Sequence, residues 1–180
     1  RLSLLFFVLA LMSKETAIVL PVLIFLLNIK DKKLLVSTIY DLRSAILISV
    51  VYLYFRLFHF GLAVGDSYLW DFSPVKAANT LVWYVLWSLG SPELLVDYIG
   101  SGLRPIPRFF ADYPSWWQFI VFPLLFLVSA SFFMLLKSIK NLNSNFWIFV
   151  LFFVISLSPV LFLPSHKFGL ELGLPLVGFA

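Results

Sequence analysis

Three polar residues, Ser13, Lys14 and Glu15, interrupt an apolar stretch that runs from Leu2 to Asn28. Most of this stretch has the composition of a membrane helix, where a central charge costs roughly 2.5–3.5 kcal/mol. On a helix, Lys14 and Glu15 lie about 100° apart, so their side chains do not face each other. We therefore expect each charge to face protein, water or a ligand, and to have a partner of its own.

The composition indicates a chain that crosses a membrane several times. Of the 180 residues, 62% are hydrophobic and 12% are charged, whereas a soluble domain carries about 25% charged residues. The mean hydropathy is +1.01. We expect an all-α fold, a polytopic transmembrane helical bundle. The absence of cysteine excludes a disulfide framework and a thiolate metal site. The net charge of +4 does not indicate binding to nucleic acid.

Five apolar blocks and the start of a sixth are expected to form part of one transmembrane domain that covers residues 1–180. The blocks are Leu2–Asn28, Ser44–Phe60, Asn79–Val96, Gln118–Leu136 and Phe146–Leu163, and the sixth begins near Gly169. The chain begins without Met and ends within an apolar segment. We interpret it as an internal piece of a longer protein, incomplete at both ends.

Basic residues predict which ends of the blocks face the cytoplasm. One loop carries Lys30, Lys32, Lys33 and Arg43, and another carries Lys137 and Lys140. Such loops are typically cytoplasmic, so an even number of crossings must separate them. Three blocks lie between them, and Gly90-Ser91-Pro92-Glu93 breaks the third near its end. We expect residues 79–96 to be re-entrant or interfacial; the alternative is that they span and violate the charge rule once.

The first block has two interpretations. It forms either one long tilted span or a tight hairpin of two short helices with Ser13-Lys14-Glu15 at the tip. Arg1 and Lys30 both have cytoplasmic character, which favours the hairpin. In the hairpin, Ser13 is a candidate N-cap of the second helix and Glu15 complements the positive helix end. A Lys beside free backbone N–H groups makes an anion site, most naturally for phosphate.

Other cations could join Lys14 around an anion. Arg56 lies one turn before the outer end of the second block, where it either snorkels to the interface or joins Lys14. His166 and Lys167 lie in a short outer turn, and either form an ordinary polar turn or add to the same cluster. Glu171 could pair with Lys167 at four-residue spacing, which would be purely structural.

No pattern indicates a metal or nucleotide site. The two His residues lie far apart in the sequence, so a divalent metal is not indicated. GxGxxG, Walker and GxSxG motifs are absent from the sequence. Four carboxylates lie in outer loops, and none stands out by its spacing: Asp66, Asp71, Asp97 and Asp112. The structural alternative for Lys14 is that it snorkels or pairs with an acidic residue outside this chain.

Several segments, in order, resemble one family. They are FVLALMSKETAIVLPVLIFLLN, VVYLYFRLFHFG, NTLVWYVLWSLGSPELLVDYIG and SPVLFLPSHKFGLELGLPLVGFA. Together they resemble the GT-C fold glycosyltransferases, in particular protein O-mannosyltransferase-like membrane proteins, including those that carry tetratricopeptide repeats. The last segment departs from the family pattern. Gly169 and Leu170 stand where related sequences have Glu-Arg, and Gly173 replaces a Tyr.

The resemblance implies a GT-C-like helical bundle with a broken or re-entrant segment. It implies a hexosyl- or pentosyltransferase that moves a sugar from a polyprenyl-phosphate-linked donor to a protein, glycan or lipid acceptor on the outer or lumenal face. A bacterial cytoplasmic membrane is expected rather than the endoplasmic reticulum. The family's general base is an Asp in the first outer loop, expected upstream of residue 1. The fragment alone would then lack its catalytic residue and be inactive.

The resemblance also implies roles for the residues of this chain. Lys14 would bind the lipid phosphate, with Arg56 as a helper. Glu15 would orient Lys14 or contact the missing loop. His166 and Lys167 would substitute for the missing Glu-Arg. Positive groups on a leaving phosphate stabilise its developing charge. One alternative is a transporter or flippase for an anionic lipid or solute, because broken helices and charges within the membrane occur there too. A third hypothesis is a scaffold whose charges only set the helix register.

Overall fold

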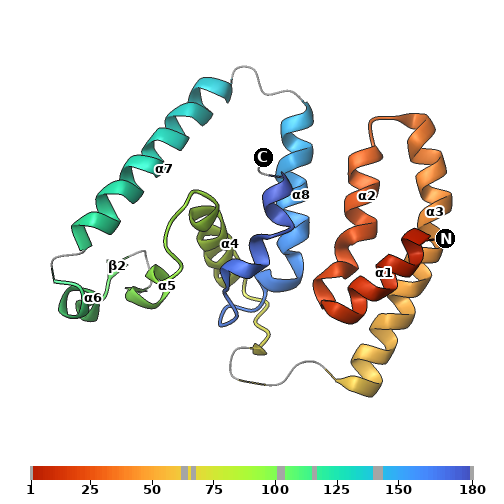
Figure 1. Cartoon of the computed structure of the whole chain (residues 1–180), viewed down its shortest axis with the longest axis horizontal. Coiled ribbons are helices and arrows are strands. Elements are labelled where there is room, and N and C mark those ends of the chain that lie inside the picture. The colour runs from red at the N-terminus through yellow and green to blue at the C-terminus, as the bar shows by residue number, and fades with distance from the viewer. Residues whose placement is uncertain are drawn as a thin grey trace.

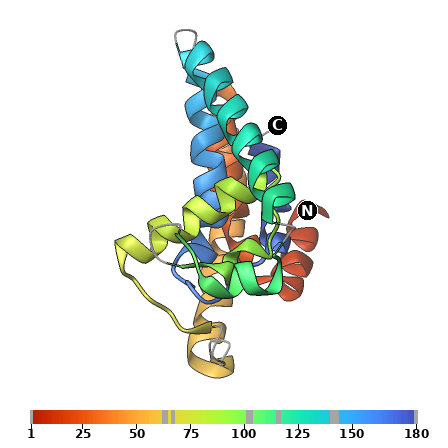
Figure 2. The same cartoon turned by 90° about the vertical axis from the view of Figure 1, so that its left-hand side faces the viewer.

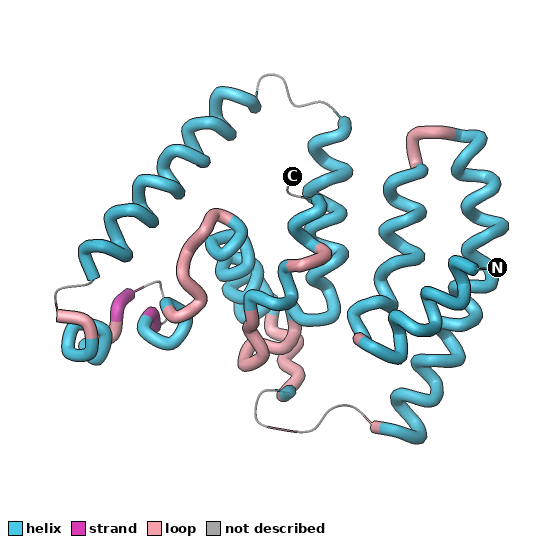
Figure 3. Tube along the Cα trace, viewed as in Figure 1, coloured by secondary structure: helices cyan, strands magenta, loops and turns pink. Residues whose placement is uncertain are grey.

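The computed structural model describes residues 2–61, 65, 68–100, 104–114, 117–139 and 144–178. The elements are α1 (Leu2–Ser13), η1 (Glu15–Val19), α2 (Leu20–Asn28), α3 (Lys32–Phe55), η2 (Arg56–Phe60), α4 (Pro74–Ser88), α5 (Leu95–Tyr98), β1 (Ile99–Gly100), β2 (Arg104–Pro105), α6 (Pro107–Asp112), α7 (Trp117–Ile139), α8 (Ser144–Leu161), η4 (Gly169–Leu172) and η5 (Pro175–Gly178). Here η2 is a π-helix and the other η elements are 3₁₀-helices. Apart from the short antiparallel pair β1–β2, the elements are helical, which confirms the all-α prediction (Figures 1 and 3).

Within these residues, one helical stretch, Thr38–Phe60, is long and apolar enough to cross a membrane. Four apolar helices are shorter: Ser3–Ser13, Glu15–Asn28, Val121–Met134 and Phe146–Leu161. Many large apolar side chains are exposed, and those on α7 include Phe126 and Phe133. The structure therefore provides one candidate membrane helix, and the crossings by the other blocks stay predictions.

The first apolar block forms two helices with a break between them. The backbone N–H of Lys14 donates to the carbonyl of Ala10 (2.8 Å) and closes α1, and Lys14 is itself extended (φ −150°, ψ 128°). Figure 1 shows α1 lying obliquely to α2 and α3. The expected N-cap role of Ser13 is wrong. Ser13 is still helical, and the break falls one residue later, so Lys14 takes the N-cap position without a side-chain cap.

The two predicted basic regions lie at one end of the molecule. Figure 1 shows the turn between α2 and α3 at the same end as the C-terminal end of α7, which carries Lys137. The predicted loop is shorter than expected, because α3 begins at Lys32 and already contains Arg43. No Gly or Pro occurs there to stop a helix, and Lys and Arg are good helix formers. Lys140 lies outside the described residues.

The third block breaks where the sequence predicts. After α4, Gly90 adopts a positive φ of 90°. Its N–H donates to the carbonyl of Trp87 (2.9 Å), and the N–H of Ser91 donates to that of Leu86 (3.1 Å). These two bonds form a Schellman motif, for which Gly is the favoured residue. Figures 1 and 2 show α4 leading away from the end that holds α5 and α6, and the chain returning to it after the break.

Three buried clusters hold the helices together. The largest lies between α4 and α8 and contains Trp83, Tyr84, Trp87, Leu95, Phe109, Phe153, Leu157, Val160, Leu161 and Leu172. A second joins α1, η1 and α3 through Phe7, Leu11, Ala17, Leu42 and Ala45. A third packs Val19, Leu23 and Leu26 against Phe152. This third cluster joins the N-terminal half (α1 to η2) to the C-terminal half (α4 to η5).

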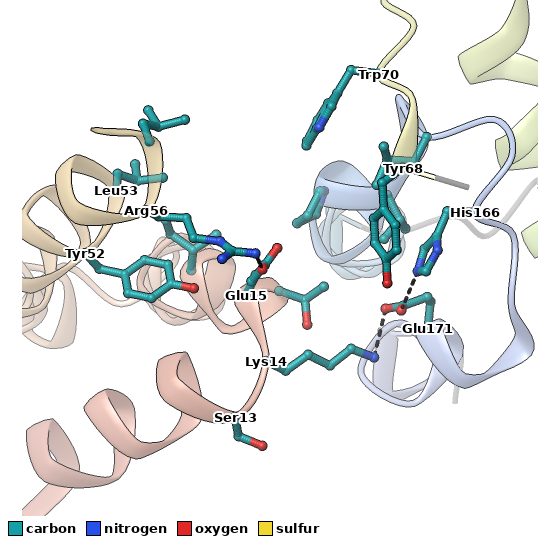
Figure 4. Close-up of a pocket in the computed structure, with 16 residues that line it drawn as sticks. Ser13, Lys14, Glu15, Tyr52, Leu53, Arg56, Tyr68, Trp70, His166 and Glu171 are labelled. Carbon is teal, nitrogen blue, oxygen red and sulfur yellow. Dashed lines mark hydrogen bonds and ion pairs between the residues drawn. The ribbon is translucent and has the colours of Figure 1, made fainter. Parts of the chain in front are cut away.

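The start of the sixth block is not one continuous helix. Residues 169–178 form two short 3₁₀-helices, η4 and η5, with a turn at Gly173 between them. Gly173 and Pro175 both disfavour the interior of an α-helix. This bent segment returns toward α8 and carries Glu171, which places a carboxylate beside the break at Lys14 (Figure 4).

Candidate functional site

Residues from both halves of the chain line a cavity of about 330 Å³, whose lining is shown in Figure 4. The break between α1 and η1, which contributes to this lining, lies at the end opposite the turn between α2 and α3 (Figure 1). Four segments line it: the break (Ser13, Lys14, Glu15, Thr16 and Ile18), the junction of α3 and η2 (Tyr52, Leu53, Arg56 and Leu57), the following loop (Tyr68 and Trp70) and the region from α8 to η4 (Pro159, Val160, Leu163, His166 and Glu171). The structure thus brings together four of the five site residues predicted from the sequence, Lys14, Glu15, Arg56 and His166.

The two neighbouring charges at the break have separate partners, as predicted. The Nζ of Lys14 lies 3.0 Å from Oε2 of Glu171. Glu15 turns the other way and forms an ion pair with Arg56 (Figure 4). The Glu171 side chain is 10% exposed and that of Lys14 is 50% exposed. The half-exposed ammonium of Lys14 therefore pairs with the nearly buried carboxylate of Glu171.

The expected pairing of Glu171 with Lys167 is wrong, because Glu171 pairs with Lys14. Four-residue spacing brings side chains together only within one α-helix. Here Lys167 precedes η4, which begins at Gly169 and is a 3₁₀-helix. The structure thus gives Lys14 an acidic partner within this chain.

His166 completes the cluster from the C-terminal half. Its ring lies against Tyr68, with the ring centroids 4.4 Å apart. Its Nε2 lies 3.8 Å from Oε1 of Glu171, which is too long for a hydrogen bond and is an ion pair only when the imidazole is protonated. Its Nδ1 is buried and has no hydrogen-bond partner among the described residues.

Arg56 is held at the point where α3 changes to the π-helix η2. Single π-turns are rare and occur frequently at functional sites. Arg56 does not merely snorkel, because it pairs with Glu15 across the cavity wall. Its Nε is buried and unpaired within the described part of the chain. Buried polar atoms are almost always hydrogen-bonded, so Arg56 Nε and His166 Nδ1 are exceptions among the described residues that line this cavity.

Lys167 lies in a different cavity. That second cavity, of about 550 Å³, is lined by Glu93, Leu94, Val96, Asp97, Pro164, Ser165, Lys167 and Phe168. Burial lowers the pKa of the Lys167 ammonium from its ordinary value. His166 and Lys167 are adjacent in the chain, but His166 lines the first cavity and Lys167 lines the second. The structure therefore does not bring Lys167 to Lys14.

The three outer-loop carboxylates that the structure describes, Asp71, Asp97 and Asp112, do not line the first cavity. Asp71 accepts hydrogen bonds from Lys76 (2.5 Å) and from the N–H of Ser73 (2.9 Å), and these bonds lower its pKa. Asp112 accepts hydrogen bonds from Tyr98 and Arg108. Asp97 lines the second cavity, and Asp66 lies outside the described residues. Within the described ranges, no group of three His, Asp or Glu residues is placed to hold a metal ion.

The sequence did not point to the aromatic wall of the first cavity, which Tyr52, Tyr68 and Trp70 form. The alternation of Tyr68 and Trp70 is a signal that could have found two of them. In an extended segment, residues two apart face the same side. Aromatic side chains of this kind offer an apolar face with a polar edge, which suits a ligand with both characters.

Comparison with family models, with curated proteins and with solved structures gives no match for this chain.

Proposed function

We propose that this protein is a membrane glycosyltransferase of the GT-C type, and that its first cavity binds the phosphate of a polyprenyl-phosphate-linked sugar. One observation carries the proposal: Lys14, Arg56 and His166, from three distant segments, line one cavity. The buried, unpaired nitrogens of Arg56 and His166 support a ligand with acceptor oxygens. A phosphate has several such oxygens in a small volume.

In this proposal the cations bind the donor and stabilise the charge that develops on its phosphate when the sugar leaves. Lys14 keeps donor capacity, because an ammonium has three N–H groups and Glu171 contacts it on one side. Glu15 and Glu171 hold Arg56 and Lys14 in place. Tyr68 and Trp70 offer an aromatic wall to the sugar. The general base belongs to an outer loop that the family resemblance places upstream of Arg1.

The proposed orientation puts the cavity on the outer side of a multi-pass membrane protein. The turn between α2 and α3 and the end of α7 carry Lys residues at the opposite end, which the positive-inside rule assigns to the cytoplasm. With residues 79–96 as a re-entrant segment, the chain enters and leaves this segment at the outer side. The exposed apolar side chains of α7 then face lipid or neighbouring membrane helices.

The experiment is a Lys14→Ala substitution in the intact protein, assayed in membranes for sugar transfer from a polyprenyl-phosphate donor. Loss of one charge-assisted hydrogen bond, about 1.5–3 kcal/mol, should reduce transfer by about 10- to 100-fold. Lys76→Ala is the matched control, because Lys76 pairs with Asp71 outside the cavity. Unchanged turnover in Lys14→Ala would sink the proposed role of this residue.

A second candidate function is a transporter or flippase for an anionic lipid or solute. The observation that favours it is the helix break at Lys14 beside two ion pairs, an arrangement found in transporters with discontinuous helices. The two functions differ in one readout. Movement of a polyprenyl phosphate across liposome membranes, without sugar transfer by the intact protein, would favour the transporter.

A further inference from the structure

The fixed charges that face one another in the first cavity sum to zero. Lys14 and Arg56 contribute two positive charges, and Glu15 and Glu171 contribute two negative charges. A monoanion that enters this partly enclosed space adds a negative charge where the dielectric screening is weaker than in water. Binding is favoured if the site gains one positive charge at the same time.

His166 is placed to supply that charge. Histidine is the side chain that ordinarily changes its charge between pH 5 and 8. Protonation would turn the 3.8 Å contact between Nε2 and Glu171 into an ion pair. It would also make both ring nitrogens donors. The buried Nδ1 has no partner within the described residues, so the imidazolium would carry a second donor there.

The surroundings of His166 show how the ligand and the proton act together. Glu171 of η4 faces both His166 and Lys14, so the imidazole and the ammonium share one carboxylate. Tyr68 and Phe168 cover the ring on other sides. If the ammonium of Lys14 pairs with a bound anion, His166 is the remaining cation that can pair with the carboxylate of Glu171. Across the cavity, Glu15 and Arg56 already neutralise each other.

We propose that anion binding in this cavity is coupled to the uptake of one proton by His166. The inference rests on the proposed function in one respect, namely that an anionic phosphate occupies the cavity. Linkage makes the effect reciprocal: the anion favours the imidazolium and the imidazolium favours the anion. Over the pH range in which the imidazole is neutral in the free protein and protonated in the complex, affinity should fall by about tenfold for each pH unit.

The test is titration calorimetry of the detergent-solubilised intact protein with geranyl methyl phosphate. This phosphodiester carries one fixed negative charge and does not itself titrate near neutral pH. Titrations at one pH, in two non-phosphate buffers with different heats of ionisation, report the number of protons taken up. We expect close to one proton for each anion bound, and tighter binding at pH 7 than at pH 8.

Two variants assign the proton. His166→Gln keeps a polar side chain, and should abolish both the proton uptake and the pH dependence while binding weakens. His59→Gln is the matched control, because His59 is the other histidine of the chain and lies on the exposed face of η2, outside the cavity lining. This variant should behave as the wild type.

Three outcomes would overturn the inference. Proton uptake that persists in His166→Gln and disappears in Glu171→Gln would assign the proton to the carboxylate. Binding by the wild type with no dependence on the buffer would refute the coupling and leave the proposed function standing. Absence of binding at millimolar phosphodiester would refute both.

Discussion

The ammonium of Lys14 lies 3.0 Å from the carboxylate of Glu171, and this ion pair joins the N-terminal half of the chain to the C-terminal half. The contact lies at the edge of the cavity and not in the apolar core, which joins the same halves through Val19, Leu23, Leu26 and Phe152. The halves are thus held by apolar packing between helices and by charge at the site.

The coupling between Lys14 and Glu171 should be measurable and small. Half of the Lys14 side chain is exposed, so solvent screening limits the pair to about 1 kcal/mol in a double-mutant cycle with Lys14→Ala and Glu171→Ala. Exchanging the two residues (Lys14→Glu with Glu171→Lys) should recover this stability without recovering anion binding, because the cation moves to the other wall. Chemical unfolding in detergent and phosphodiester titration give the two readouts. A swap that restores binding would show that only the presence of a cation matters.

Arg56→Ala should impair binding far more than folding. Its partner Glu15 is 54% exposed, and the loss of such a pair costs about 0–1 kcal/mol. Binding of the phosphodiester should weaken by about tenfold or more, since a charge-assisted donor is lost. Arg56→Lys should recover only part of it, because Lys lacks Nε and the planar fork. Arg108→Ala is the control, since Arg108 pairs with Asp112 outside the cavity. Equal binding by both Ala variants would exclude Arg56 from the site.

The end of α4 depends on Gly90. Gly90→Ala should destabilise the protein by about 1–2 kcal/mol, the cost of a side chain at positive φ. The Cβ would find room, because Leu127 lies 3.8 Å away, so the strain lies in the backbone. Gly173→Ala is the control, because Gly173 has ordinary right-handed helical angles and its Cβ would lie 3.8 Å from the nearest atom. Thermal unfolding of both variants decides the matter, and equal midpoints would contradict the Schellman ending.

Asp71 should give the folded protein a specific sensitivity to acid. Hydrogen bonds from Lys76 and from the N–H of Ser73 lower its pKa below the ordinary value of 3.8. The unfolded chain therefore takes up a proton at a higher pH than the folded one. The stabilisation is complete well above pH 3.8 and is lost as the pH falls through the folded pKa. Unfolding measured at pH 6 and at pH 3 should show a smaller loss for Asp71→Asn than for the wild type; equal losses would rule out this contribution.

The features that could be predicted from the sequence are those determined by residues close together in the chain. The break at Ser13-Lys14-Glu15 follows from the cost of charges within an apolar helix. The end of the third block follows from Gly90 and Pro92, which disfavour a continuing helix. The need for separate partners for Lys14 and Glu15 follows from their angle on a helix. Each of these depends on a few consecutive residues and on backbone geometry.

The partners themselves could not be predicted in the same way. Glu171 reaches Lys14 because η4 bends back toward the break, and this path depends on packing between α2 and α8. The sequence offered Lys167 as the nearer partner, an interpretation that assumed an α-helix where a non-helical turn precedes a 3₁₀-helix. The turn that contains Lys167 has no periodicity from which the direction of a side chain can be inferred. The N-cap position also differs from the predicted one by one residue, since it is Lys14 and not Ser13.

The turn at residues 164–168 contributes side chains to both the first and the second cavity. His166 faces the first cavity, and Pro164, Ser165, Lys167 and Phe168 line the second. His166 and Lys167 are consecutive residues, so a change in the backbone at one of them affects the other. A rotation of the backbone that lets His166 accommodate a new neighbour also reorients Lys167 on the far side. A ligand that moves this part of the backbone in one cavity would therefore also change the wall of the other cavity.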